Sequence, residues 1–112
     1  MENKFKTAYR TNTNGELTEK ENKKDVVLCG WVHSNRDHGG LIFIDLRDRY
    51  GITQIVLDPK NKDFKEAEHL RREDFIQVKG KVRLRPKEMI NKSISTGQIE
   101  IIRSIQNWNL PI

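Results

Sequence analysis

The sequence predicts one all-β domain with small α content, a five-stranded barrel with a single helix between the third and fourth strands. Two observations carry this prediction. Five segments have the alternating or β-branched composition of strands, and only one segment, between the third and fourth of them, has apolar residues at helical spacing. The length of 112 residues suits one domain with its own core.

The chain divides into an arm, five strands and a helix. Residues 1–24 are polar and aperiodic, and we expect an N-terminal arm there. Strands are expected at residues 26–33, 41–48, 52–58, 75–85 and 98–103, and the helix at residues 62–73. The polar residues 34–40 are expected to form the turn into the second strand. Gly30 lies inside the first strand, where a glycine marks the bulge or sharp bend that a small barrel needs.

This order of elements is typical of the oligonucleotide/oligosaccharide-binding (OB) barrel, a Greek-key fold. There the face of the second and third strands, with neighbouring loops, binds nucleic acid. Two other functions fit the same elements. A free-standing OB module would bind single-stranded nucleic acid without sequence preference, and a protein-interaction OB domain would show no salt-dependent binding of RNA.

Positive charge is concentrated in one part of the chain. Residues 78–92 contain six basic side chains and one acidic one, a net charge of +5 that equals the net charge of the whole chain. Such a strip favours a polyanionic partner. It also fits a solvated strand face whose lysines discourage edge pairing, so charge alone leaves both interpretations open.

Strand alternation separates an outward face from the core. Phe43 shares its face with the polar residues Asp45 and Arg47, so we expect its ring on the solvent side, together with Gln54 and Glu100. A base can stack on an aromatic ring for about 1–3 kcal/mol, and amide or carboxylate groups can bond to base edges. A ring that covers the barrel end would fit the pattern equally well. The residues of the fourth strand expected to face inward are Val78, Gly80, Val82 and Leu84.

No grouping of residues indicates catalysis or a metal site. Asp45 and Asp48 fall on opposite faces of one strand, and Cys29 and His33 would lie about 13 Å apart along another. A single cysteine cannot form an internal disulfide, and no apolar stretch approaches the roughly 20 residues of a membrane span. Trp31 and Trp108 are expected to pack rather than to stack on bases.

Specific motifs then point to one family. The segment GWVHSNRDHGGLIFIDLRDRYGITQIVLD (residues 30–58), with TGQIEI (residues 96–101), closely resembles the N-terminal domain of bacterial aspartyl-tRNA synthetases. The opening YRTNTNGEL (residues 9–17) and the closing LPI (residues 110–112) resemble that family too. The resemblance covers essentially residues 8–112 and implies an anticodon-binding OB domain at residues 25–104. Residues 105–112 would then begin a linker to a catalytic domain.

The resemblance also implies roles for single residues. The phenylalanine matching Phe43 stacks on the central uracil of the anticodon, with the residues matching Gln54 and Arg36 nearby. The residue matching Glu100 reads the first base, a guanine, and residues near Arg85, Met89 and Asn91 lie toward the third. Together with the basic strip, these assignments define the expected RNA-binding set: Arg36, His38, Phe43, Gln54, Lys81, Arg83, Arg85, Asn91 and Glu100.

Two positions depart from the pattern of the family. Many relatives carry an arginine run before Arg36, where this chain has Ser34 and Asn35. His38 stands where the family has leucine or histidine, and histidine there accompanies charging of both aspartate and asparagine tRNAs. We therefore hypothesise that the parent enzyme is non-discriminating; a turn histidine without a role in selectivity is the alternative.

For the full-length protein the resemblance implies a cytoplasmic, homodimeric class II ligase. It would attach aspartate to tRNA(Asp) using ATP and Mg²⁺. The motifs of the catalytic domain that binds ATP and Mg²⁺ in the family do not occur within these 112 residues. The fragment is therefore expected to be non-catalytic, to hold no cofactor and to have the anticodon loop of tRNA(Asp) as its partner.

Overall fold

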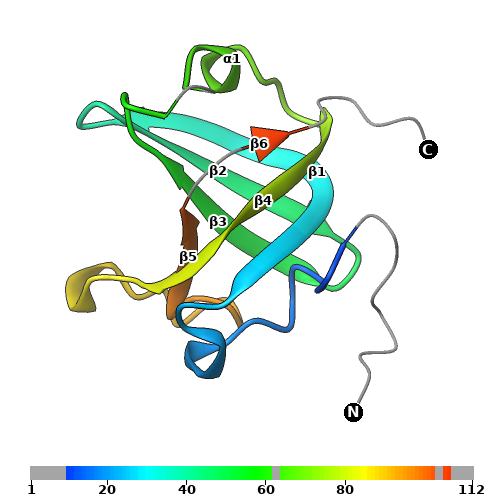
Figure 1. Ribbon diagram of the computed structural model, residues 1–112, viewed down its shortest axis with the longest axis vertical. Coiled ribbons are helices and arrows are strands. Elements are labelled where there is room, and N and C mark those ends of the chain that lie inside the picture. Colours follow the sequence, from blue (N-terminus) through cyan, green and yellow to red (C-terminus); the bar gives the residue numbers. More distant parts are fainter. Residues whose placement is uncertain (1–9, 62–63, 103–104, 107–112) are drawn as a thin grey trace.

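In the described part of the computed structural model, five strands, β1 to β5, form one closed barrel, and a short sixth strand pairs with β4 (Figure 1). The structure describes residues 10–61, 64–102 and 105–106. Its strands are β1 (Asp25–His38), β2 (Leu41–Asp48), β3 (Gly51–Leu57), β4 (Phe75–Leu84), β5 (Ile99–Ile102) and β6 (Ile105–Gln106). They lie in the order β1-β2-β3-β5-β4-β6, and a further pairing of β1 with β4 closes the barrel. All pairings are antiparallel except the parallel pairing of β3 with β5.

The predicted all-β barrel with one helix between the third and fourth strands is confirmed. The helix α1 (Phe64–Glu68) follows β3, and two 3₁₀ turns, η1 (Glu19–Glu21) and η2 (Lys87–Met89), lie before β1 and between β4 and β5. Among the described residues, no helix is long and apolar enough to cross a membrane. The prediction for Trp108 falls on residues outside the described part of the chain.

Strand β1 is longer than predicted, because the polar segment that looked like a turn continues the strand. Its first half pairs with β4 and its second half with β2, so one strand wraps around the barrel (Figure 1). Only Gly39 and Gly40 form the turn, with φ angles of 63° and 83°. Positive φ at both central residues is the requirement of a tight hairpin turn, and glycine meets it without strain.

The irregularity in β1 lies beyond the position predicted for it. The register with β2 shifts between Val32 and Ser34, rather than at Gly30. Gly30 has a different reason to be glycine: a Cβ atom there would lie 2.5 Å from the carbonyl oxygen of Arg47 on β2. The glycine therefore allows a close approach of two strands, and the bulge follows three residues later.

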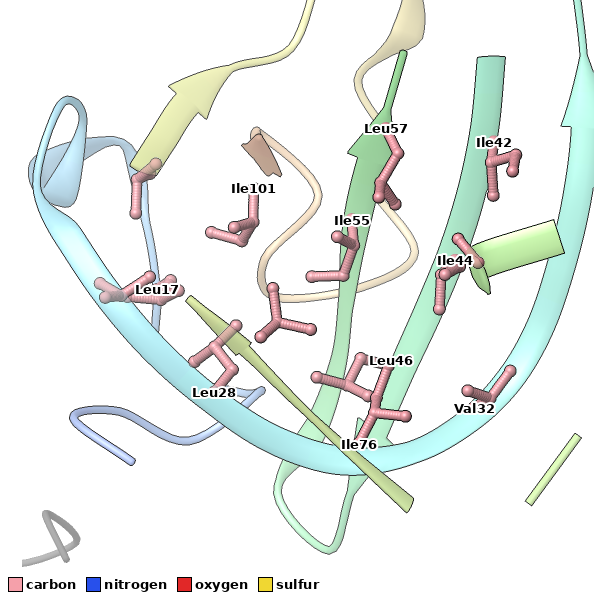
Figure 2. Close-up of a cluster of buried hydrophobic side chains, with 14 of the residues drawn as sticks. Leu17, Leu28, Val32, Ile42, Ile44, Leu46, Ile55, Leu57, Ile76 and Ile101 are labelled. Carbon is pink, nitrogen blue, oxygen red and sulfur yellow. The ribbon is translucent and has the colours of Figure 1, made fainter. Parts of the chain in front are cut away.

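The core fills the barrel from inward-facing strand residues, as Figure 2 shows. Ile42, Ile44 and Leu46 of β2 are all fully buried, as strand alternation predicted. Leu17, from the segment predicted as an arm, is also fully buried and belongs to this cluster. Burying an aliphatic side chain of this size contributes about 1.5–3 kcal/mol. Residues 10–24 thus contribute to the core, although their composition is polar.

Two further predictions differ from the structure. Leu84 was expected to face inward, but it is 46% exposed because it is the last residue of β4, at the rim of the barrel. The helix was expected at residues 62–73; α1 ends at Glu68, and residues 62–63 lie outside the described residues. Asn35 of β1 explains the early end, because its Nδ2 donates to the carbonyl oxygens of Ala67, at 2.7 Å, and Leu70, at 3.0 Å. These bonds satisfy carbonyls that a longer helix would have used itself.

Candidate nucleic-acid interface

The outward residues of neighbouring strands form rows across one face of the barrel. Phe43 of β2 lies opposite Arg36 of β1 on one side and Val56 of β3 on the other. In the next row, Asp45 lies opposite Ser34 and Gln54. Strand pairing alone therefore gathers polar residues that are far apart in sequence around the ring of Phe43.

A network of side chains joins these rows from β1 to β4. The guanidinium of Arg36 donates through Nη2 to Asp45 Oδ1, at 3.2 Å, and to Gln54 Oε1, at 3.4 Å. Gln54 Nε2 donates to Glu100 Oε1 at 3.0 Å. Arg83 then donates to Glu100 Oε2 from Nε, at 3.0 Å, and from Nη2, at 2.6 Å. We call Arg36, Asp45, Gln54, Glu100 and Arg83 the outer-face network.

The centre of this network is nearly closed to solvent. Gln54 is 6% exposed and Glu100 is 4% exposed, whereas the arginines at the two ends are exposed. A buried carboxylate is costly unless it is paired and hydrogen-bonded, and Arg83 and Gln54 meet both needs of Glu100. The predicted outward direction of Gln54 and Glu100 is therefore compatible with their burial, because neighbouring side chains cover them outside the barrel core.

A hollow of about 420 Å³ opens beside Phe43. Its lining residues are Arg36, Asp37, His38, Phe43, Gln54 and Met89. The ring of Phe43 is half-buried, and the Arg36 guanidinium carbon lies 5.8 Å from the ring centroid, within the range of a cation–π contact. One hollow therefore unites an aromatic surface, a cation, an amide and the loop that carries Met89.

Arg85 is buried and bonds to backbone carbonyl groups, whereas Arg36 and Arg83 are exposed. It is 8% exposed, and its Nε donates to the carbonyl oxygen of Ile99 at 2.8 Å. Its Nη1 donates to the carbonyl oxygen of Met89 at 3.4 Å. Burial lowers the pKa of the Arg85 guanidinium from its ordinary value, and the nearby carboxylate of Glu100 opposes that shift. Arg85 therefore connects β5 with the loop that follows β4, and its bond to Met89 stabilises the position of that residue beside the hollow.

The structure separates the remaining predicted site residues. Lys81 lies on β4 with its Nζ 3.5 Å from Asp25 Oδ1, away from the Phe43 hollow. Asn91 is exposed on the loop between β4 and β5, where its Oδ1 accepts from the backbone N–H of Ser93 at 2.9 Å. His38 ends β1 and lines the hollow with Phe43. Arg36, His38, Phe43 and Gln54 thus come together, Glu100 and Arg83 join them through the network, and Lys81 and Asn91 lie apart.

Two residues of this face were not predicted as part of a site. Asp45 bonds to Arg36 and also accepts from the Ser34 hydroxyl at 2.5 Å. Its outward direction was visible from alternation, but its partners depend on the register of β1, which sequence patterning did not reveal. Val56, opposite Phe43, is outward by the same alternation that selected Gln54. Among the described residues, no group of His, Cys, Asp and Glu side chains could hold a metal ion.

Comparison with known proteins identifies the family. Residues 26–102 match the profile of the OB-fold nucleic acid binding domain of tRNA anticodon type, and the chain belongs to that family. Within it, the chain is similar to the amino-terminal anticodon-binding domain of aspartate–tRNA ligases. The resemblance recognised in the sequence is therefore confirmed.

Individual relatives show how far the similarity extends. The aspartate–tRNA(Asp/Asn) ligase of Pelagibacter ubique (strain HTCC1062) is 50% identical over 93 residues, which are 83% of this chain and 16% of the ligase. That of Endomicrobium trichonymphae is 55% identical over 89 residues, 79% of this chain and 15% of the ligase. The crystal structure of asparaginyl-tRNA synthetase from Pyrococcus horikoshii matches with a TM-score of 0.69 and 27% identity, over 87% of this chain and 22% of that one. The chain thus spans less than a fifth of the length of the two aspartate–tRNA ligases and about a fifth of the asparaginyl-tRNA synthetase.

Proposed function

We propose that this domain recognises the anticodon loop of tRNA(Asp) by splaying its bases across the outer face of β1, β2, β3 and β5. The observation that carries the proposal is the hollow beside Phe43, bounded by Arg36 and Gln54 and joined through Gln54 to Glu100. An accessible aromatic ring beside hydrogen-bonding groups suits an unstacked base, which stacks on the ring and bonds through its edge.

In this proposal the middle base of the anticodon, a uracil, stacks on Phe43. The Arg36 guanidinium already lies near that ring, so it is placed to bond to the edge of the base or to a neighbouring phosphate. Gln54 is held with its carbonyl toward Arg36 and its amide N–H toward Glu100. Its orientation is thus set before RNA arrives, which lowers the entropic cost of binding.

Glu100 would read the first base, a guanine, through its carboxylate. A carboxylate has about four acceptor positions, and Glu100 uses three of them, two for Arg83 and one for Gln54. Guanine offers two donors, its ring N–H and its amino group, so one of these three bonds opens when both are accepted. Arg83 is exposed whereas Gln54 is buried, so we assign the released bond to Arg83. Arg83 thereby acts on recognition through Glu100.

The proposed role of the whole protein follows from its ligase relatives. A full-length protein carrying this domain would be a cytoplasmic, homodimeric class II ligase that attaches aspartate to tRNA(Asp) with ATP and Mg²⁺. The anticodon domain would contribute recognition and no chemistry. A binder of single strands without sequence preference is the alternative, and the similarity to ligases named for tRNA(Asp/Asn) supports anticodon recognition instead.

A first-base experiment tests this proposal. We would measure binding of the 112-residue chain to anticodon stem-loops with GUC and with inosine in place of the guanine, which removes the amino group. Glu100→Gln is the matched variant. We expect the wild-type chain to bind the inosine loop about tenfold more weakly, within the range of one lost base contact, and Glu100→Gln to show a much smaller difference. Equal binding of both loops by the wild-type chain would rule out reading of guanine by Glu100.

We further propose that the parent enzyme accepts both tRNA(Asp) and tRNA(Asn). His38 lines the Phe43 hollow together with Met89, on the side proposed for the third base, where the GUC and GUU anticodons differ. The ligases of Pelagibacter ubique and Endomicrobium trichonymphae carry both tRNAs in their names. Charging of the two tRNAs by the full-length enzyme, with His38→Leu alongside, tests this: strong rejection of tRNA(Asn) by the unmutated enzyme would refute it.

A further inference from the structure

A second hollow of about 410 Å³ lies on the same outer face, beyond the site assigned above. Its apolar floor is made by Leu41, Val56 and Ile102, and Asp58, Lys60 and Arg83 stand at its edge. We propose that it binds the base of a fourth nucleotide, the one that precedes the anticodon triplet on its 5′ side. The inference rests on the proposed anticodon recognition and extends it by one nucleotide.

The hollow continues the surface on which the middle base is proposed to stack. Leu41 precedes Phe43 by two residues on β2, so the two side chains share a face and their Cα atoms lie about 7 Å apart. Val56 lies directly opposite Phe43 on β3, and Ile102 lies opposite Val56 on β5. A nucleotide strand bound at Phe43 would therefore reach this hollow within one or two residues.

The chemistry of the hollow suits a nucleotide. Val56 is 5% exposed and Leu41 and Ile102 are half-buried, so the floor offers an aliphatic surface for the flat face of a base. Arg83 and Lys60 add two positive charges at the edge, where the phosphates of a bound strand would pass. The carboxylate of Asp58 adds acceptors for the exocyclic amino group of a base. An apolar floor between cations and one acceptor matches a nucleotide better than an apolar peptide segment.

The position of Arg83 indicates in which direction the bound RNA runs across this face. It lines this hollow and also bonds to Glu100, the residue proposed to read the first base. Met89, on the side of the third base, lines the other hollow. An RNA that runs from Met89 past Phe43 to Glu100 proceeds from the third base of the anticodon to the first. The next nucleotide of this RNA, beyond Glu100, is therefore the one on the 5′ side of the triplet.

Abasic nucleotides test the proposal. Binding of the 112-residue chain would be measured to a GUC stem-loop, to the same loop with an abasic nucleotide directly 5′ of the triplet, and to one with the abasic nucleotide directly 3′ of it. The 5′ abasic loop is expected to bind about fivefold more weakly than the intact loop, because it lacks the base that would cover the apolar surface of Leu41, Val56 and Ile102. In Leu41→Ser, which exposes a hydroxyl in the floor, the 5′ abasic substitution should no longer matter.

Matched variants separate this result from general damage. Leu84→Ser changes an exposed leucine of β4 that does not line the hollow, and it should keep the fivefold effect. Ile102→Thr, which preserves the branched shape, serves as the second floor variant if Leu41→Ser does not fold. An equal effect of the 5′ abasic nucleotide in the wild-type chain and both floor variants, or no effect in the wild-type chain, would overturn the proposal. Equal binding of GUC and unrelated loops would instead overturn the anticodon proposal itself.

Discussion

Phe43 is the residue on which the proposed recognition depends most. Its ring is half-buried, lies outside the hydrophobic core cluster and lines the hollow. Phe43→Ala is expected to weaken binding of a GUC stem-loop by about 1–3 kcal/mol, because the stacking surface is lost, while the fold is retained. Fluorescence anisotropy titrations with a thermal melt of each protein check this. An unfolded variant whose folded fraction binds normally would show that Phe43 has a structural role.

Arg83 was predicted from its charge, and from its bonds to Glu100 we propose that it positions that residue. Two of its donors bond to one oxygen of Glu100, and a lysine cannot reproduce that fork. Arg83→Lys keeps the charge, so we expect the preference for guanine over inosine to fall on the order of fivefold while the salt dependence of binding stays unchanged.

Lys81→Ala is the matched control for this prediction. Lys81 lies on the same strand but pairs with Asp25, outside the outer-face network. Its loss should weaken binding of all RNAs alike and reduce the salt slope by roughly 0.7 if it contacts one single-strand phosphate. If Arg83→Lys leaves the preference for guanine intact, Arg83 acts as a charge and not through Glu100.

At the scale of elements, β1 connects the barrel to its helix through Asn35. The two bonds from Asn35 Nδ2 satisfy carbonyl oxygens at the end of α1. In Asn35→Ala the Ala67 carbonyl keeps its bond from the Leu70 backbone N–H, at 3.2 Å, but the Leu70 carbonyl loses the bond from Asn35. The free energy of unfolding is therefore expected to fall by about 1–3 kcal/mol. Urea denaturation checks this, with Lys65→Ala on the exposed face of α1 as the control. A change equal to that of the control would show that the carbonyls find other partners.

The same elements show what the sequence could and could not predict. The bounds of β2 and the inward face of Ile42, Ile44 and Leu46 follow from strict alternation, which tertiary contacts preserve. The second half of β1 was missed because its residues are polar; they form a strand through pairing with β2, a contact distant in sequence. The rim position of Leu84 depends on where the barrel ends, which local pattern does not encode.

In the candidate site, too, the sequence could place some residues but not others. Phe43, Gln54 and Glu100 could be placed on the outer face from sequence because each lies outward on a well-patterned strand; their part in binding stays a prediction. Charge suggested Arg83 and Arg85 alike, yet one bonds to Glu100 on the outer face and the other is buried against Ile99. Their difference arises from where β4 ends, at Leu84, after which the side chain of Arg85 turns beneath the loop.

At the scale of the whole molecule, Cys29 links protonation to stability. It is buried, and burial raises the pKa of its thiol above the ordinary value of 9.0, against opposing effects of Arg10 and Gln77. The folded state therefore holds the proton more tightly than the unfolded state in alkaline solution. The resulting stabilisation is complete below pH 9 and is lost as pH rises through the pKa of the folded state. Urea denaturation between pH 8 and about 10.5 should show a steeper loss of stability in the wild-type chain than in Cys29→Ala; parallel curves would contradict it.

Recognition by the whole barrel is tested most directly by a competition between three anticodon stem-loops, with GUC, GUU and an unrelated triplet, followed by fluorescence anisotropy at one fixed, moderate salt concentration. Because all three carry the same number of phosphates, electrostatic attraction contributes equally and differences report on base contacts. We predict that GUC displaces a labelled GUC loop at markedly lower concentration than the unrelated loop, and that GUU competes nearly as well as GUC if the His38 proposal holds. Equal competition by all three loops would contradict the account, because the face around Phe43 and Glu100 would then bind single strands without reading them.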